Sequence, residues 1–389
     1  MWKAGKLDHS WGTYMNLSRL SLLAVAVSMT STGLAGAQGQ QSGVVVSQPR
    51  PQSTEDLKTI LGGKTLRQWI AEISSPDPSR RENAIRTVVL MKGSQEAIPA
   101  LIERVERDGD SSPRVNAIIA LGAVPMAPDE DVSKIVAALR KRLGEDSQSI
   151  IRFQAALVLG RFGGKSRSAR TELIRATKDQ GSWEIRKAAV FALTRAEADV
   201  AVPVNSQAIE AIVARLSQAN ESSALVRLEA AMSIATIGRL SLQDHKLVSN
   251  ALAAAERDHE KMVGIWARVG LAVHENKLTK EDMNTLIKFL ENRDLPARTH
   301  AARAIGTIAS LGDPGPLIKP AVPALMSMLD RDSEELAKIA AIWALGRIGR
   351  PSEPALKRLN ELLADKKLSE EGRNFIKEAI DMIQGKGKN

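Results

Sequence analysis

The sequence predicts an all-α protein built as a solenoid, a stack of helix pairs that repeats along one axis. Three observations lead to this prediction. One pattern recurs about every 36.5 residues from Thr65 onward. Each repeat holds two segments with apolar residues at three- and four-residue spacing, and small residues stand at fixed places in the second segment. A drifting period of this length is typical of helical solenoids, whose units bury their apolar faces against their neighbours.

The first 37 residues are predicted to be a secretory signal peptide. A basic segment that ends at Arg19 is followed by an apolar run over 20–29 and then by small residues that end in Ala37, the order that signal peptidase reads. We expect cleavage between Ala37 and Gln38, with Met1 and Met15 both open as the true start. The apolar run is too short to span a bilayer as a helix. We therefore expect a periplasmic or extracellular protein without stable membrane insertion.

Residues 38–64 are predicted to form a flexible linker, because this stretch is rich in Gln, Ser, Pro and Gly and has little helical periodicity. The whole chain contains no cysteine, which excludes disulfides, thiolate metal sites and cysteine nucleophiles. Aromatic residues make up only 3% of it. Stability must therefore come from packing of aliphatic and small side chains.

The predicted solenoid covers 65–384 and is followed by a disordered tail over 385–389. The nine repeats begin at a basic residue near the start of the second helix, and an alanine follows three residues later in most of them. These basic residues are Arg81, Arg114, Arg152, Arg186, Arg227, Lys261, Arg298, Lys338 and Arg373. The repeat at Lys261 departs most, because Gly264 and Arg268 replace the expected small and apolar residues.

The turns before the second helices carry an acidic residue four positions ahead of the basic one, as in Asp77, Asp110 and Asp294. We expect these acids to cap the second helices. The basic residues are expected to tie successive turns together. We therefore predict a structural role for six turn arginines, which are Arg81, Arg114, Arg152, Arg186, Arg227 and Arg298.

The turn acid, the arginine and the A-x-x-A-L-G core resemble the HEAT-repeat family, in the bacterial form that overlaps with phycobilisome-lyase-like repeats. The resemblance extends over the whole predicted solenoid. It implies a right-handed superhelix of about nine helix pairs, in which the second helices line a concave face that binds proteins. It implies neither a cofactor nor a metal.

Two sets of residues are candidates for contact with a partner. The densest positive charge lies at the loop between two repeats, at Arg161, Lys165, Arg167 and Arg170, and is a candidate for binding an acidic partner or an anionic polymer. Trp266 and Trp343 follow their basic residues by five positions and are either packed between layers or exposed on the concave wall as anchors. We do not expect nucleic acid as a partner, because no aromatic residue lies among these cations.

The sequence offers little for catalysis. Two His-Glu pairs, His259-Glu260 and His274-Glu275, lie too far apart on a continuous helix to share a metal. The prediction is a non-enzymatic, exported scaffold that grips a protein or an extended peptide. Two alternatives stay open: a phycobilisome-lyase-like enzyme or chaperone, and a binder of anionic cell-surface polymer through the basic loop.

Overall fold

The computed structural model describes residues 61–124, 128–198, 203–237, 240–275, 277–311, 315–364 and 370–386. The predicted signal peptide, its cleavage site at Ala37 and Gln38, and the linker as far as residue 60 lie outside the described residues, as do the last three residues of the predicted tail. The chain divides into two compact units, whose described parts are 61–172 and 173–386. We call them the N-terminal and C-terminal units.

The N-terminal unit consists of helices joined by short turns. In chain order its elements are α3 (Leu66–Glu72), α4 (Pro78–Leu90), α5 (Ile98–Arg107), α6 (Ser111–Gly122), α7 (Asp129–Glu145), α8 (Ser149–Phe162) and the 3-10 helix η2 (Gly163–Ala169). The boundary between the two units falls within α9 (Arg170–Ala176).

The C-terminal unit continues the same alternation. Its elements are α10 (Trp183–Ala196), α11 (Ser206–Ala214), α12 (Ala224–Thr236), α13 (Leu242–Ala255), α14 (Lys261–Glu275), α15 (Lys280–Phe289), α16 (Leu295–Leu311), η3 (Gly315–Ile318), α17 (Ala321–Arg331), α18 (Glu335–Ile348), η4 (Arg350–Ala355), α19 (Leu356–Leu363) and α20 (Glu370–Ile383).

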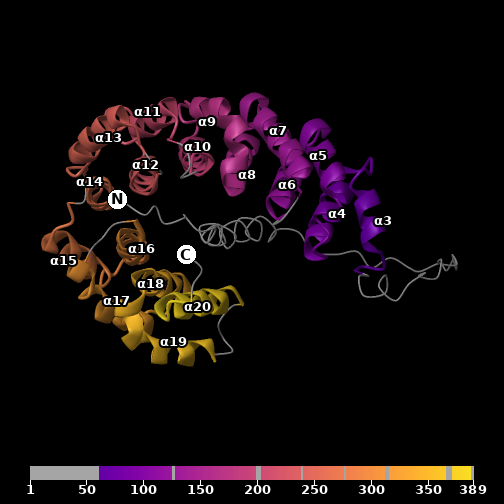
Figure 1. Cartoon of the computed structure of the whole chain (residues 1–389). Coiled ribbons are helices and arrows are strands. Elements are labelled where there is room, and N and C mark those ends of the chain that lie inside the picture. Colours follow the sequence, from indigo (N-terminus) through magenta and orange to yellow (C-terminus); the bar gives the residue numbers. More distant parts are fainter. Residues whose placement is uncertain are drawn as a thin grey trace. The chain divides into compact units, whose positions relative to one another are not determined.

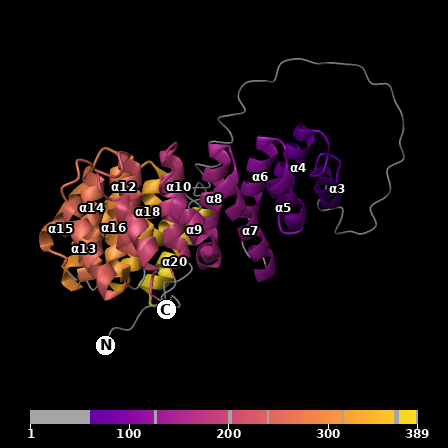
Figure 2. The ribbon, with the colours of Figure 1, turned by 90° about the horizontal axis from the view of Figure 1, so that it is seen from above.

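The described part of the chain is therefore all-α, and its helices follow one another as nine pairs from α3/α4 to α19/α20. Within the N-terminal unit α4, α6 and α8 pack side by side as one layer, and α5 and α7 pack as another (Figures 1 and 2). Within the C-terminal unit the second helices α12, α16, α18 and α20 lie on the inside of the curve, whereas α11, α13, α15, α17 and α19 lie outside (Figure 1). This is the layered architecture of a helical solenoid.

Small residues allow the second helices to approach one another closely. The alanine three positions after the basic residue is fully buried in each of six repeats, at Ala117, Ala155, Ala189, Ala230, Ala301 and Ala341. A Cβ added at Gly306 would lie 2.1 Å from the Trp343 ring, and one added at Gly346 would lie 2.9 Å from the backbone of Ala379. Glycine at these places therefore sets the spacing between α16, α18 and α20.

The turn acids behave in two ways. Asp77 caps α4, since its side chain accepts a hydrogen bond from the Ser79 N–H at 2.8 Å, and Asp294 accepts one from the Ala297 N–H at 3.2 Å. Asp110 makes no capping bond, so the expectation that it caps α6 is wrong. Its carboxylate instead binds an arginine of the preceding repeat, as described below.

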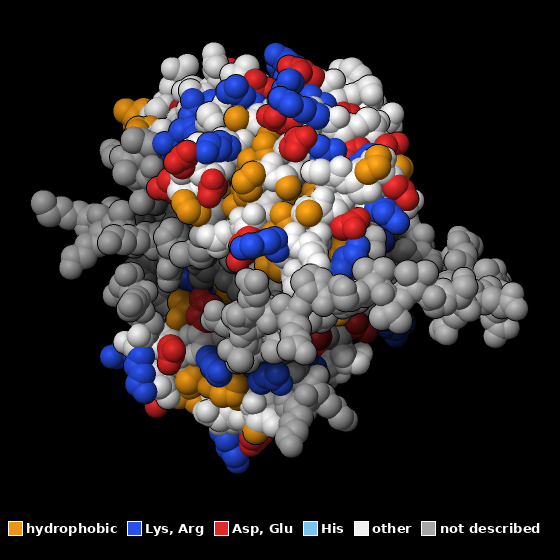
Figure 3. Space-filling model, turned by 90° about the vertical axis from the view of Figure 1, so that its right-hand side faces the viewer, with side chains coloured by type: hydrophobic (Ala, Val, Ile, Leu, Met, Phe, Trp, Pro, Cys, Tyr) orange, Lys and Arg blue, Asp and Glu red, His pale blue; other side chains and the backbone are white. Residues whose placement is uncertain are grey.

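Leu61 to Lys64, the first described residues, contact the first helix of the N-terminal unit. Leu61 and Lys64 form a β-bridge, and the Trp69 indole N–H donates to the Leu61 carbonyl at 2.8 Å. The sequence places these residues in the predicted flexible linker, yet Leu61 is hydrogen-bonded to Trp69 of the first helix. Large apolar side chains are exposed in this first pair, with Leu61 44% and Leu90 74% exposed. Figure 3 shows hydrophobic side chains gathered on part of one face among charged ones.

Candidate functional site: the arginine ladder and the inner wall

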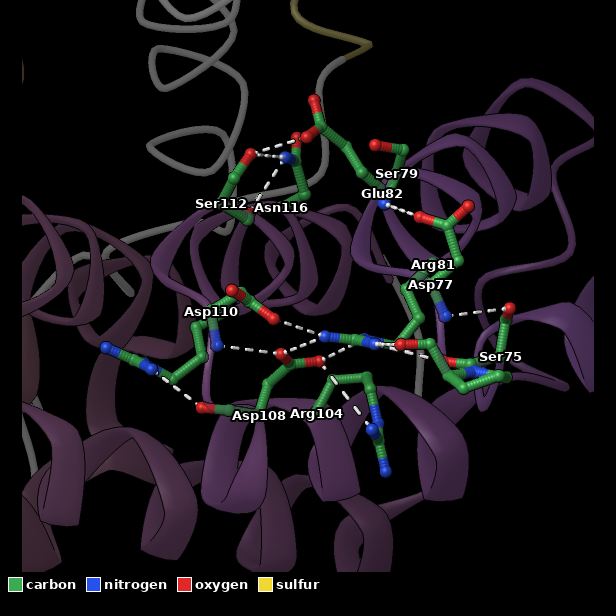
Figure 4. A network of polar contacts seen from close by, with 12 residues as sticks. Ser75, Asp77, Ser79, Arg81, Glu82, Arg104, Asp108, Asp110, Ser112 and Asn116 are labelled. Atoms are coloured by element: carbon green, nitrogen blue, oxygen red, sulfur yellow. Dashed lines mark hydrogen bonds and ion pairs between the residues drawn. The ribbon is translucent and has the colours of Figure 1, made fainter.

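The arginine at the fourth position of α4 joins one repeat to the next. Arg81 donates from Nε and Nη2 to the two carboxylate oxygens of Asp108, each over 2.7 Å, and from Nη2 to Asp110 over 2.8 Å (Figure 4). Its Nη1 donates at 3.0 Å to the carbonyls of Ser75 and Pro76 in its own turn. One guanidinium therefore donates hydrogen bonds both to carbonyls in the turn before α4 and to carboxylates in the turn between α5 and α6.

The same arrangement recurs along both units, and we call the set of linked turns the arginine ladder and each link a rung. In each of these repeats the arginine also donates from Nη1 to one or two backbone carbonyls of its own turn. Arg152 makes such hydrogen bonds to the carbonyls of Asp146 and Ser147. The further rungs are Arg114 with Asp146 (3.4 Å), Arg186 with Glu221 (2.6 Å), Arg227 with Asp258 (2.7 Å) and Arg298 with Asp332 (2.6 Å).

The rungs are buried ion pairs. The acidic side chains of all five are at most 5% exposed. Burial by itself raises the pKa of Glu221, Asp258 and Asp332, but the hydrogen bonds and positive charge of their arginines outweigh it, and each pKa lies below its ordinary value. Because the carboxylates stay ionised, loss of either partner would leave an uncompensated charge in the turn.

The acidic partners of the ladder were not found from the sequence. Asp108, Asp146, Glu221, Asp258 and Asp332 each stand six residues before the fourth position of the following second helix. The acid predicted to act at each turn is the one four residues ahead, as in Asp110. A search for an acid at the larger spacing, repeated at the same period, would have found all five.

Among the described residues, no rung joins the repeats of α14 and α16. The fourth residue of α14 is Gly264, so Lys261, the first residue of that helix, does not hold the position of the other basic residues. The expected register of this repeat is therefore wrong by three residues. A Cβ at Gly264 would lie 2.8 Å from the Glu256 carbonyl oxygen, which excludes a larger side chain. Asn292 stands where the partner acid would be, six residues before Arg298.

At this α14–α16 joint a different ion pair connects α14 to α15, the first helix of the next repeat. Arg268 of α14, which is 44% exposed, donates to Asp282 of α15 at 3.2 Å. The contact between α14 and α16 is the least extensive between successive second helices within either unit. Ile265, Val269 and Ile308 line a small cavity at the same place. The joint is thus held by an exposed ion pair where the neighbouring joints have buried ones.

The basic loop is less available than the sequence suggests. Of its four candidate residues only Lys165 is exposed, and its Nζ lies 2.7 Å from Asp129 Oδ1. Arg161, Arg167 and Arg170 are half-buried, and none of them is without an interaction partner. A role of these four residues in contact with a partner stays a prediction, as does a role in binding an anionic polymer.

The two tryptophans proposed as surface anchors are buried. Trp266 is 1% exposed and Trp343 is 6% exposed. The Trp343 ring packs against Gly306 of the neighbouring helix and lies 5.5 Å below the Arg347 guanidinium. The structure corrects the expectation of exposure and supports the other reading, in which the rings pack between layers.

The second helices of the C-terminal unit present other side chains to the inside of its curve, and we call this surface the inner wall. Phe191, Met232 and Arg303 each stand two residues after a buried alanine of α10, α12 or α16. Two residues correspond to about 200° of helix rotation, so these side chains point away from the buried alanine row. All three are half-buried. These three side chains are therefore partly accessible on the second helices.

The histidines of the His-Glu pairs do not meet. His259 is exposed, whereas burial lowers the pKa of His274, whose Nε2 lies 2.6 Å from the Ile234 carbonyl. His245 packs edge-on against the His274 ring at 5.8 Å. In the described ranges, no group of three or more His, Cys, Asp or Glu side chains is placed to hold a metal ion. No described helix combines the length and apolar character needed to cross a membrane.

Comparison with protein families identifies the class of protein. A HEAT-repeat family model matches residues 66–160, 107–194 and 283–373. These ranges together cover more than half of the chain, so the chain belongs to the HEAT-repeat family. No match was found among the curated proteins.

Several solved structures are similar to this chain at low sequence identity. The complex of CpcE and CpcF of phycocyanin lyase from a Nostoc species has a TM-score of 0.45 and 19% identity, covering 88% of this chain and 100% of that chain. YibA of Escherichia coli has a TM-score of 0.41 and 17% identity, covering 77% and 98%. Importin beta has a TM-score of 0.41 and 14% identity, covering 83% of this chain and 46% of its own.

Proposed function

We propose that this protein is a non-enzymatic, exported interaction scaffold that binds a protein or an extended peptide along the inner wall of the C-terminal unit. Membership of the HEAT-repeat family supports a role in protein binding, because stacked helix pairs present a long surface built from successive second helices. The observation that carries the proposal is the row of half-buried side chains at Phe191, Met232 and Arg303. Two of these side chains are apolar and one is basic, and aromatic residues, Met and Arg are the types enriched at protein interfaces.

The arginine ladder supports the same function. Buried rungs fix the distance between successive turns, so the inner-wall side chains are held at set spacings before a partner arrives. Such preorganisation lowers the entropy lost on binding. The proposal assigns no catalytic residue, since the described arginines and acids of the turns already satisfy one another. Export rests on the signal-peptide pattern, and a mature N-terminus at Gln38 would support it.

Affinity capture with the chain from residue 38 onward tests the proposal. Phe191→Glu or Met232→Glu places a charge on the inner wall, and Ala253→Glu on the exposed side of α13 serves as the matched control. The inner-wall variants should lose a partner that the wild type and the Ala253 variant retain, with unchanged helical circular dichroism in all four. A partner retained by the inner-wall variants and lost by the control would place the binding surface on the outer helices.

A further inference from the structure

The first helix pair has a free side, because no described repeat precedes α3 and α4. Contacts between later helices show which positions of a second helix face the repeat before it. A Cβ added at Gly122 of α6 would lie 2.9 Å from Val158 and 3.3 Å from Arg161, the tenth and thirteenth residues of α8. The thirteenth residue of α4 is Leu90, which is 74% exposed. A large apolar side chain therefore lies exposed at a position that contacts the preceding helix elsewhere in the N-terminal unit.

The start of α3 contributes to the same end of the solenoid. Leu66 packs on the turn that follows Leu90, since a Cβ added at Gly93 would lie 2.2 Å from the Leu66 side chain. Leu61 is 44% exposed and accepts a hydrogen bond from Trp69 of α3. Figure 3 views the molecule from the side on which α3 lies in Figure 1, and hydrophobic side chains are exposed there. We call this free side of the pair the end face.

An exposed apolar end is a liability for a stack of repeats. Solenoids need terminal repeats with polar outer faces to stay soluble, because an uncovered apolar end can add to another molecule. Arg86 of α4 follows this rule, whereas Leu90, one turn later, does not. We therefore expect a further element to cover the end face.

The charges of the first pair and its turns favour an acidic occupant. Three exposed basic residues have no ion pair within the described ranges, namely Arg67, Arg80 and Lys92. Two exposed acidic residues share that state, Asp77 and Glu96, and Asp77 is engaged as the cap of α4. The pair thus carries a small excess of positive charge, which disfavours contact with a second copy of itself and favours a segment with an acidic excess.

The preceding segment of the chain, residues 53–60, has the required composition. It lies outside the described residues and joins the end face directly at Leu61. Its apolar residues Leu57 and Ile60, together with Leu61, have the three- and four-residue spacing of one helix face. Two acidic residues stand directly before Leu57 and one lysine directly after it. The segment therefore combines apolar side chains with an acidic excess.

We propose that residues 53–60 dock on the end face and close the N-terminal end of the solenoid, with Leu57 against Leu90. The length of the segment permits this contact. The four residues from Leu57 to Leu61 span up to about 14 Å when extended, and packed helices lie about 8 to 10 Å apart. Covalent attachment keeps the segment at a high effective concentration near its site. This surface is separate from the inner wall and does not depend on the proposed function.

Disulfide formation tests the contact directly, because the chain contains no native cysteine. Leu57→Cys is combined with Leu90→Cys in the chain from residue 38 onward and oxidised under mild conditions. The control combines Leu57→Cys with Ala137→Cys, which changes an exposed residue of α7. Both variants are first checked for wild-type circular dichroism and melting. The first pair should form an intramolecular disulfide at least about tenfold faster than the control, because the bond requires closely placed Cα atoms.

A second measurement does not require disulfide geometry. Ellman's reagent labels the thiol of Leu90→Cys, and Leu57→Lys with Ile60→Lys should raise the labelling rate at least about threefold by removing the apolar contact. Val45→Lys adds a lysine outside the segment and should leave that rate unchanged, as should the double lysine change for Ala137→Cys. An unchanged labelling rate in the double lysine variant or equal disulfide rates in the two cysteine pairs would overturn the proposal. A covalent dimer of the Leu90→Cys variant would also overturn it, because a second copy would then occupy the end face.

Discussion

Replacement of Arg227 by alanine is predicted to destabilise the C-terminal unit strongly. The guanidinium donates to Asp258 at 2.7 and 3.0 Å and to the carbonyls of Glu221 and Ser222 at 2.9 and 3.0 Å. The side chains of Arg227 and Asp258 are only 8% and 1% exposed. Removing one member of a buried ion pair leaves the other charge uncompensated, so the expected loss is about 3 to 5 kcal/mol.

The free energy of unfolding is measured by urea titration with circular dichroism at 222 nm. Because a solenoid can unfold in parts, amide hydrogen exchange on α12 and α14 locates the loss. Arg86→Ala is the control, since its pair with Glu82 is 47% and 26% exposed and should contribute about 0.2 to 1 kcal/mol. Adding Asp258→Asn to the Arg227 variant should recover part of the loss. Equal effects of Arg227→Ala and Arg86→Ala would refute a structural role for the rung.

Three further outcomes are expected. Burial is the main cause that lowers the pKa of His300 from 6.5 to about 3 in the folded chain. The unfolded chain therefore takes up the proton first, so the free energy of unfolding falls as the pH drops from 6.5 toward 3. Urea titrations across this range should show a weaker pH dependence of that free energy for His300→Leu but not for His259→Leu, which changes an exposed residue. Gly306→Ala drives a Cβ into Trp343 and should cost about 1 to 3 kcal/mol, whereas Gly144→Ala, with 3.6 Å of clearance, should leave the melting temperature unchanged or higher. Amides of α14 and α16 should exchange faster than those of α12 and α18, with a difference that grows at high salt as the Arg268–Asp282 pair is screened; equal exchange rates would show that the missing rung does not loosen the joint.

The sequence predicted the helix pairs well because their signals are local. A basic residue, an alanine three positions later and a small residue after that fix the buried face of one helix, and Arg152 with Ala155 shows this in a single turn. The acidic partners in the ladder could not be predicted from local patterns, because Asp108 pairs with Arg81 across 27 residues. Only the stacking of repeats brings those two side chains together.

The solvent exposure of individual side chains could not be predicted from the sequence. Trp343 and Trp266 occupy places on the helix surface that a single pair would leave open, and neighbouring helices in the folded unit bury both. The register error at Lys261 has a related cause. Gly264 is required by the close approach of α14 to the Glu256 carbonyl, a contact between two helices that leaves no periodic signal in the sequence.

Site-specific photo-crosslinking tests the central claim, that a partner binds along the inner wall of the C-terminal unit. A benzophenone amino acid is placed at Met232 on α12 or at Ala253 on the exposed side of α13, and each protein is irradiated with the partner obtained by capture. The account predicts a covalent adduct from Met232 and none from Ala253. An adduct from Ala253 with none from Met232 would contradict it.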